Sequence, residues 1–196
     1  MHNASTIAAR PRVLADLIPG ELLRDALLVI GGAGFIGLLA QVSFALPGDP
    51  VPVTGQTLGV LLAGAALGSR RAPLASILYL LAGVVGVPWF AGHSAGWPGA
   101  TAGYVVGFIF CSALCGWLAE RGADRTVWRA LATMVVGECV TFTFGLLWLA
   151  LDLHLGAGRA IALGLSPFIA GEGVKLAAAA ALLPASWRVL RRLEAR

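Results

Sequence analysis

Residues 127–151 read VWRALATMVVGECVTFTFGLLWLAL, an apolar run that contains only two charged side chains, Arg129 and Glu138. A helix crosses the hydrocarbon core of a bilayer with about 20 residues, so this run is long enough to span a membrane. It lacks the alternation of apolar and polar residues that is typical of a barrel strand. The run therefore predicts a transmembrane α-helix.

The rest of the chain has the same character. Of its 196 residues, 58% are apolar and 12% are charged, whereas soluble domains have about 45–50% apolar and about 25% charged residues. Five more apolar runs cover approximately residues 22–46, 56–68, 73–87, 101–118 and 160–183. We therefore expect an all-α, polytopic membrane protein with six transmembrane helices in residues 22–184, the backbone of which satisfies its own hydrogen bonds in lipid.

The segments at the two ends of the chain are polar. Residues 1–21 contain Arg10, Arg12 and Asp16 and lack the apolar core of a signal peptide, so they are expected to form a cytoplasmic lead-in. Pro184 is expected to end the sixth helix. Residues 185–196 would then be a basic cytoplasmic tail.

Positive charges are distributed unevenly between the predicted loops. Twelve of the fourteen Lys and Arg residues precede or open the first run, lie between the second and third or the fourth and fifth runs, or follow the sixth. Arg159 is on the opposite side, and Lys175 lies within the sixth run. Because positively charged loops remain in the cytoplasm, we expect both termini to be cytoplasmic in a multi-pass protein of the cell (inner) membrane.

The two long loops on the external side are rich in proline, glycine and aromatic residues. They cover residues 47–57 and 87–99. Stiff loops of this kind suit the walls of a pocket that is open to the outside, although Trp89 and Trp97 could equally be residues of the interfacial aromatic belt.

Three charged side chains fall in the interior of the predicted spans, away from the ends of the runs. Glu172 and Lys175 share one face of the sixth helix, and Glu138 lies at a similar depth in the fifth. Buried charges in a membrane normally act on a ligand, on an ion or on each other. We favour the binding of a polar solute by Glu172 and Lys175 over a structural ion pair and over a proton relay between Glu138 and Glu172.

Small residues at a spacing of four mark faces at which helices approach closely. Ala33 and Gly37 form such a pair in the first run. Most pairs of this kind serve internal packing, but we expect this one to contact a partner protein.

Several kinds of site are not predicted. The chain contains no G-x-x-x-x-G-K-[ST], no H-E-x-x-H and no G-x-S-x-G motif, so we expect no catalytic residues and no ATP hydrolysis by this chain. Cys111 and Cys115 have no accompanying His or third Cys, which argues against a metal site. We expect no cofactor and no nucleic-acid partner.

Four segments resemble one family in order along the chain. Residues 50–68, PVPVTGQTLGVLLAGAALG, closely resemble the pattern P-x-P-x-T-x-Q-T-L-x-V-L-L-A-G-x-x-L-G of the BioY family. The other three segments are residues 79–92, 99–108 and 167–175. Ala100 stands where the family has proline, and Glu172 replaces its usual aspartate, which keeps the charge.

The resemblance implies the six-helix fold of a substrate-binding (S) component of an energy-coupling-factor (ECF) transporter. It implies capture of biotin from outside, with a transmembrane coupling (T) subunit and ABC-type ATPase subunits as partners, and it allows a homo-oligomer in the bilayer. A suitable pocket is apolar with a few polar groups. Its expected residues are Thr54, Gln56, Trp89, Phe90, Tyr104, Glu138, Glu172 and Lys175.

Three other functions stay open at this point. The chain could be an S component for another vitamin, or a stand-alone carrier that depends on an ion gradient. It could also be a structural membrane protein in which Glu172 and Lys175 only join helices.

Overall fold

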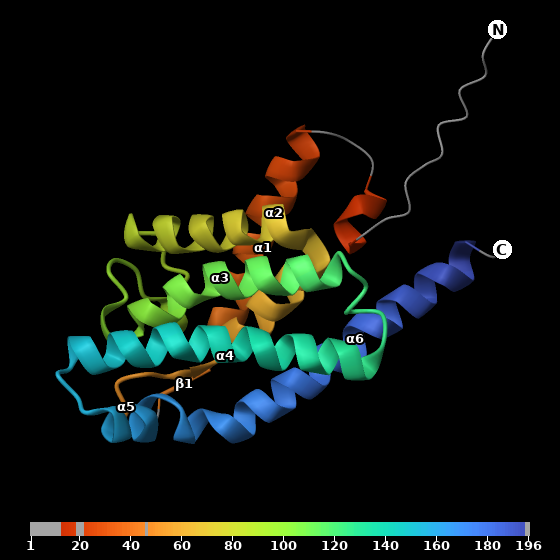
Figure 1. The fold of residues 1–196 in the computed structure, drawn as a ribbon. Coiled ribbons are helices and arrows are strands. Elements are labelled where there is room, and N and C mark those ends of the chain that lie inside the picture. Colours follow the sequence, from red (N-terminus) through yellow and green to blue (C-terminus); the bar gives the residue numbers. More distant parts are fainter. Residues whose placement is uncertain (1–12, 19–21, 46, 195–196) are drawn as a thin grey trace, which may run out of the picture.

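The computed structural model describes residues 13–18, 22–45 and 47–194. Its longer elements are α1 (Leu22–Ala40), α2 (Gln56–Val84), α3 (Ala102–Ala119), α4 (Val127–Asp152), α5 (Ala157–Gly164) and α6 (Ile169–Glu194). Short elements complete the chain: β1 (Ser43–Phe44), β2 (Val53–Thr54), and the 3-10 turns η1 (Leu14–Leu17), η2 (Ala91–His93), η3 (Gly99–Thr101) and η4 (Ser166–Phe168). The two strands form one small antiparallel hairpin, and the rest of the structure is a bundle of helices (Figure 1).

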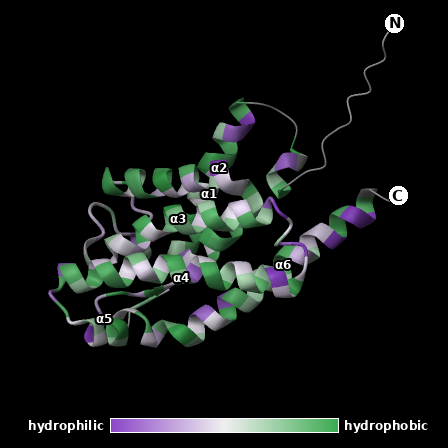
Figure 2. Cartoon of the chain, in the orientation of Figure 1, coloured by the Kyte–Doolittle hydropathy of each residue, from purple (hydrophilic) through white to green (hydrophobic). Residues whose placement is uncertain are grey.

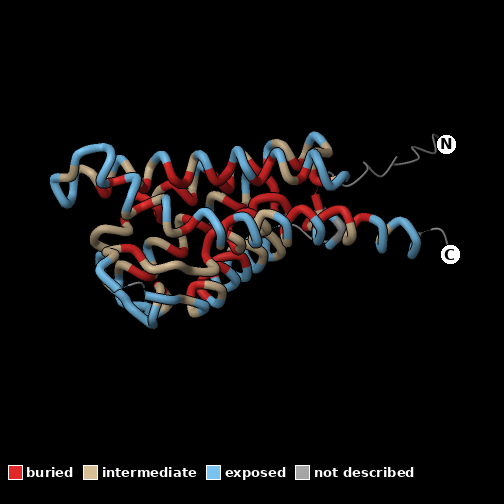
Figure 3. Tube along the Cα trace, turned by 90° about the horizontal axis from the view of Figure 1, so that it is seen from below, coloured by how far each residue is buried: buried red, intermediate tan, exposed pale blue. Residues whose placement is uncertain are grey.

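The helices are apolar on their outer faces as well as inside the bundle. Within the part of the chain that the structure describes, four segments are long and apolar enough to cross a membrane: Leu22–Ala40, Gly99–Ala119, Val127–Asp152 and Ala157–Leu193. Large apolar side chains such as Leu22, Leu38 and Leu147 are exposed. Figure 2 shows hydrophobic residues along most of the helices, and Figure 3 shows exposed residues along the outer sides of the bundle. The expectation of a helical membrane protein is confirmed.

The second and third predicted spans are two halves of α2, which bends sharply at Gly68. This residue has φ +85° and ψ 176°, a left-handed backbone that glycine adopts readily because it has no Cβ. The helix resumes at Ser69, whose N–H and hydroxyl both donate to Glu120 at 2.8 Å. The sequence interpretation of residues 69–71 as a connecting loop was therefore wrong.

The last predicted span also differs from the structure. Residues 160–183 do not form one helix, because α5 ends at Gly164 and a turn at η4 precedes α6. Pro184 lies inside α6, which continues to Glu194. The expected end of the helix at Pro184 was therefore wrong, and the described part of the predicted tail is an extension of α6.

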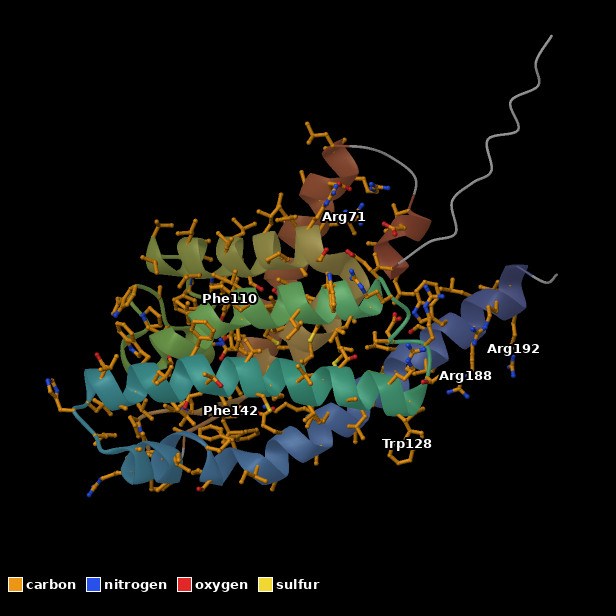
Figure 4. The ribbon with its side chains drawn as sticks, in the orientation of Figure 1. Arg71, Phe110, Trp128, Phe142, Arg188 and Arg192 are labelled. Atoms are coloured by element: carbon orange, nitrogen blue, oxygen red, sulfur yellow. The ribbon has the colours of Figure 1, made fainter. Side chains whose placement is uncertain are left out.

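Charged side chains collect at the end of the bundle where α6 finishes. Arg71, Arg188 and Arg192 all lie toward this end (Figure 4). Arg71 pairs with Asp16 of η1 and Asp25 of α1, at 3.0 Å each. These pairs fasten the described part of the N-terminal segment to the bend of α2.

A second contact at this end joins the α3–α4 loop to α6. The indole N–H of Trp187 donates to Asp124 at 2.5 Å, and the guanidinium of Arg125 lies 3.5 Å above the centre of the Trp187 ring. Burial raises the pKa of the Asp124 carboxyl group above 3.8, while the bond from Trp187 and the charge of Arg125 lower it. The hydrogen bond from Trp187 therefore stabilises the ionised form of the Asp124 carboxyl group.

Replacing Trp187 with phenylalanine should lower the free energy of unfolding by about 1–3 kcal/mol near neutral pH, because a buried acceptor loses its donor. The hydrogen bond favours the ionised form of Asp124. The difference in unfolding free energy between the variant and the wild type should therefore decrease as the pH falls through the raised pKa of Asp124. Thermal unfolding in detergent over a pH series would measure this. Trp128→Phe is the control, since Trp128 is 79% exposed, and equal losses in both variants would contradict the prediction.

Candidate functional site

A cavity of about 220 Å³ lies within the bundle, toward the end away from Arg188 and Arg192. The loop before α2 contributes Val51 and Thr54 to its lining, and the loop after α2 contributes Phe90. The first turn of α2 and the start of α6 contribute Thr57 and Glu172. The cavity is therefore enclosed by segments that are far apart in the sequence.

Five of the sixteen residues that line the cavity are aromatic. Tyr104 and Phe108 come from α3, one helical turn apart, and Phe142 comes from α4. The Tyr104 and Phe142 rings meet edge to face at 5.8 Å, and Phe168 lies 6.2 Å from Phe142. Phe142 points from α4 toward the α5–α6 side of the bundle (Figure 4). Such a wall suits an apolar ring system.

Glu172 and Lys175 form the charged part of the site. The ammonium of Lys175 donates to Glu172 at 2.6 Å, to the Thr54 carbonyl at 2.6 Å and to the Thr57 hydroxyl at 2.9 Å. The Thr57 hydroxyl in turn donates to the other Glu172 oxygen at 2.9 Å. An ammonium has three donors, so these partners occupy all of them. Glu172 lines the cavity, whereas Lys175 is not part of the lining and binds Glu172 from the side away from the cavity.

Gln56 is oriented by a chain of hydrogen bonds. Thr54 donates to its side-chain oxygen at 2.8 Å, and its amide nitrogen donates to the Tyr79 hydroxyl at 2.6 Å. Tyr79 is fully buried. Thr54 and Gln56 thus present polar atoms to the cavity from a fixed position.

Trp89 was expected in the pocket, but it is not part of the cavity lining. Its indole N–H donates to the Tyr79 carbonyl at 2.9 Å, and its ring lies 5.3 Å from the Tyr79 ring. It also packs against Gly37 of α1, where an added Cβ would come within 3.2 Å of it. Trp89 therefore joins α1 to α2, and the neighbouring Phe90 reaches the cavity.

Glu138 lies beside the cavity and not in its lining. It is 6% exposed, and neither carboxyl oxygen has a hydrogen-bond partner among the described residues. It lines an apolar groove between α4 and α6 that shares Phe142 and Glu172 with the cavity. Glu138 is thus separated from the cavity by these two side chains.

The expected partner surface on α1 needs correction. Ala33 is fully buried, and Gly37 faces Trp89. Both residues therefore serve packing inside the bundle in this structure. The glycines of α1 with open space around them are Gly31 and Gly34.

Several residues of the cavity lining were not selected from the sequence, among them Thr57, Phe108, Phe142 and Phe168. Helical spacing would have indicated the three aromatic residues. Phe108 follows Tyr104 by four residues, Phe142 follows Glu138 by four, and Phe168 precedes Glu172 by four, and residues four apart share one side of a helix.

Three comparisons with known proteins agree with this architecture. The model of the BioY family matches residues 6–192. The biotin transporter BioY of Rhizobium etli is 38% identical over 157 residues, which cover 75% of this chain and 82% of that protein. Biotin transporter BioY2 of Lactococcus lactis is 33% identical over 151 residues, covering 76% and 81%. A crystal structure of the S-component for biotin from an ECF-type ABC transporter superposes with a TM-score of 0.76 at 20% identity, covering 85% of this chain and 92% of that one.

Proposed function

Because the chain belongs to the BioY family, we propose that it takes up biotin and binds this vitamin in the cavity between the two loops and α2, α3, α4 and α6. The family consists of transport proteins, so the chain is not an enzyme. The observation that carries the proposal is the cavity itself, which joins an aromatic wall to the buried Glu172–Lys175 pair.

The chemistry of biotin matches the two kinds of surface in the cavity. Its ring system and alkyl chain are apolar and would lie against Tyr104, Phe142 and Phe168. Its ureido group offers N–H donors, for which Glu172 is the charged acceptor in the lining. Lys175 has no free donor, so its role is to fix Glu172 and balance its charge.

The membrane arrangement follows from the same proposal. The two halves of α2, together with α1, α3, α4 and α6, supply six crossings in residues 22–184. The arginine-rich end is cytoplasmic by the positive-inside rule, so residues 1–21 and 185–196 lie inside the cell and the cavity opens outward. The protein resides in the cell (inner) membrane.

Energy for uptake would come from partners. The sequence has no phosphate-binding loop, so ATP hydrolysis belongs to ABC-type ATPase subunits that act through a transmembrane coupling subunit. The chain then serves as the S component of an ECF-type transporter. Uptake by liposomes that contain only this chain, driven by an ion gradient, would favour a stand-alone carrier instead.

Calorimetry on the detergent-purified chain tests the binding step. The wild type should bind one biotin and should not bind riboflavin or thiamine. Thr57→Val should weaken biotin binding by at least about tenfold, or about 1.4 kcal/mol, because Glu172 and Lys175 each lose a partner. Thr143→Val is the control, since the Thr143 hydroxyl is exposed and donates to the Cys139 carbonyl of its own helix. A folded wild type that fails to bind biotin would refute the proposal.

A further inference from the structure

The side chain of Gln41, which directly follows α1, joins this helix to the loop after α2. Its amide nitrogen donates to the carbonyls of Gly37 at 2.8 Å and Trp89 at 3.0 Å, with a longer contact of 3.4 Å to Phe90. Its oxygen accepts the backbone N–H of His93 at 3.2 Å. The amide therefore uses both its donor and its acceptor functions to hold one turn of the loop.

That turn covers residues 89–94 and has an unusual backbone. The Phe90 N–H donates to the Ser94 carbonyl at 3.1 Å, and the Ser94 hydroxyl donates to the Ala91 carbonyl at 2.9 Å. Gly92 and His93 both have positive φ, +66° and +58°. A left-handed conformation is uncommon for a residue other than glycine and persists where surrounding contacts hold it. The Gln41 bond to His93 is one of those contacts.

The turn carries part of the cavity wall. Phe90 is 4% exposed, and its ring lies so close to Gly83 that a Cβ there would fall 2.1 Å from it. It also meets Tyr79 edge to face at 5.2 Å. Ala91 and Ser94 line the cavity beside it. A turn that moved away from α1 would open this side of the cavity.

The other cavity-lining loop is fastened at the same end of α1. The N–H of Gly55 donates to the Val42 carbonyl at 2.8 Å. Gly55 also approaches α1 closely, since a Cβ there would come within 2.6 Å of the Leu39 carbonyl oxygen. Thr54, which directly precedes Gly55, lines the cavity. The end of α1 is therefore the place where both loops over the cavity are attached.

We propose that Gln41 is a positioning residue that sets how long the ligand stays bound, because its amide fastens the 89–94 turn, and with it Phe90, to the end of α1. Movement of α1 is passed through Gln41 to the cavity wall. The identity of the ligand as biotin rests on the proposed function. The fastening of the turn does not depend on it.

Two variants separate the bonds of Gln41. Gln41→Leu removes all the hydrogen bonds that the Gln41 side chain makes. Gln41→Glu has the same shape and keeps an acceptor for the His93 N–H, but it places an oxygen against the carbonyls of Gly37 and Trp89. Val42→Ala is the control, because the Val42 side chain is 53% exposed and the bond from Gly55 uses the backbone.

Association and dissociation of radiolabelled biotin should be measured on the purified chain. Both Gln41 variants should release biotin at least about tenfold faster, with association changed by less than about threefold, since changes at one interface act mainly on dissociation. The control should match the wild type. An unchanged dissociation rate in both variants would overturn the proposal, as would a loss of thermal stability with no separate effect on dissociation. If the Gln41→Leu protein does not fold, the dissociation rate of the isosteric Gln41→Glu protein decides the outcome.

Hydrogen exchange of the ligand-free protein gives a readout that does not require biotin. Amides of residues 87–96 should exchange faster in the Gln41 variants, while those of α3 and α4 should not change. If the wild type does not bind biotin, the proposed function fails, and the exchange comparison still decides whether Gln41 fastens the turn. Equal exchange in the wild type and both variants would show that it does not.

Discussion

Replacing Lys175 with methionine is expected to lower the affinity for biotin by at least about 100-fold, the largest loss expected from any single substitution at the proposed site. Removing one partner of a buried ion pair leaves an uncompensated charge, which costs about 3–5 kcal/mol. Here that charge is the Glu172 carboxylate, and the Thr54 carbonyl and Thr57 hydroxyl lose their donor as well. Methionine keeps a flexible apolar side chain in the same space. Calorimetry with biotin measures the loss.

A double variant distinguishes a binding site from a helix clamp. Glu172→Gln combined with Lys175→Met removes both charges, and replacing a whole buried pair by neutral groups is often close to neutral for stability. We expect the double variant to melt near the wild-type temperature and still to bind biotin weakly. If biotin binding returned together with stability, the pair would serve structure alone. Wild-type affinity in Lys175→Met would contradict the prediction outright.

Gly116→Val is expected to give the largest loss of stability. An added Cβ at Gly116 would fall 2.4 Å from the carbonyl carbon of Gly68 and 2.5 Å from the backbone nitrogen of Ser69. These are main-chain atoms at the bend of α2, so they cannot turn aside as the end of a side chain can. Overpacking typically costs about 1–3 kcal/mol, and we expect at least about 3 kcal/mol here, which lowers the melting temperature by about 6 °C or more.

The control for this variant is Gly34→Val, which also lies in a long helix but has nothing within 4 Å of its added Cβ. Thermal unfolding of both proteins in one detergent isolates the effect of packing from the effect of helix propensity. Equal melting temperatures would show that α3 and the bend of α2 can separate without cost, contrary to the prediction.

The membrane helices could be predicted from the sequence because hydropathy is a local property. Residues 127–151 were expected as a span, and α4 covers Val127–Asp152. The bend of α2 could not be found this way. It depends on the contact of Gly68 with Gly116 of α3, and no feature of residues 69–71 shows that a helix resumes there. The division of the last span at η4 was missed because residues 160–171 contain no charged side chain, and Ser166 and Pro167 were interpreted as part of one apolar run.

The site was predictable to the extent that charges and motifs are visible in a sequence. The structure gathers Thr54, Gln56, Phe90, Tyr104 and Glu172 round one cavity. Trp89 and Phe90 are both aromatic and adjacent in the sequence, but adjacent side chains in an extended segment point to opposite sides. Only the fold determines which of the two faces the cavity.

The bend at Gly68 also bears on how the protein enters the membrane during its synthesis. At 1.5 Å per residue, residues 56–68 and 69–84 form helices of about 20 and 24 Å, and the hydrocarbon core is about 30 Å thick. Neither half is long enough to be recognised as a span by itself. In the proposed arrangement of six crossings, the two halves would insert together as one hairpin with Arg70 and Arg71 next to its tip. A mutation that straightened α2 would then change the topology of the helices that follow.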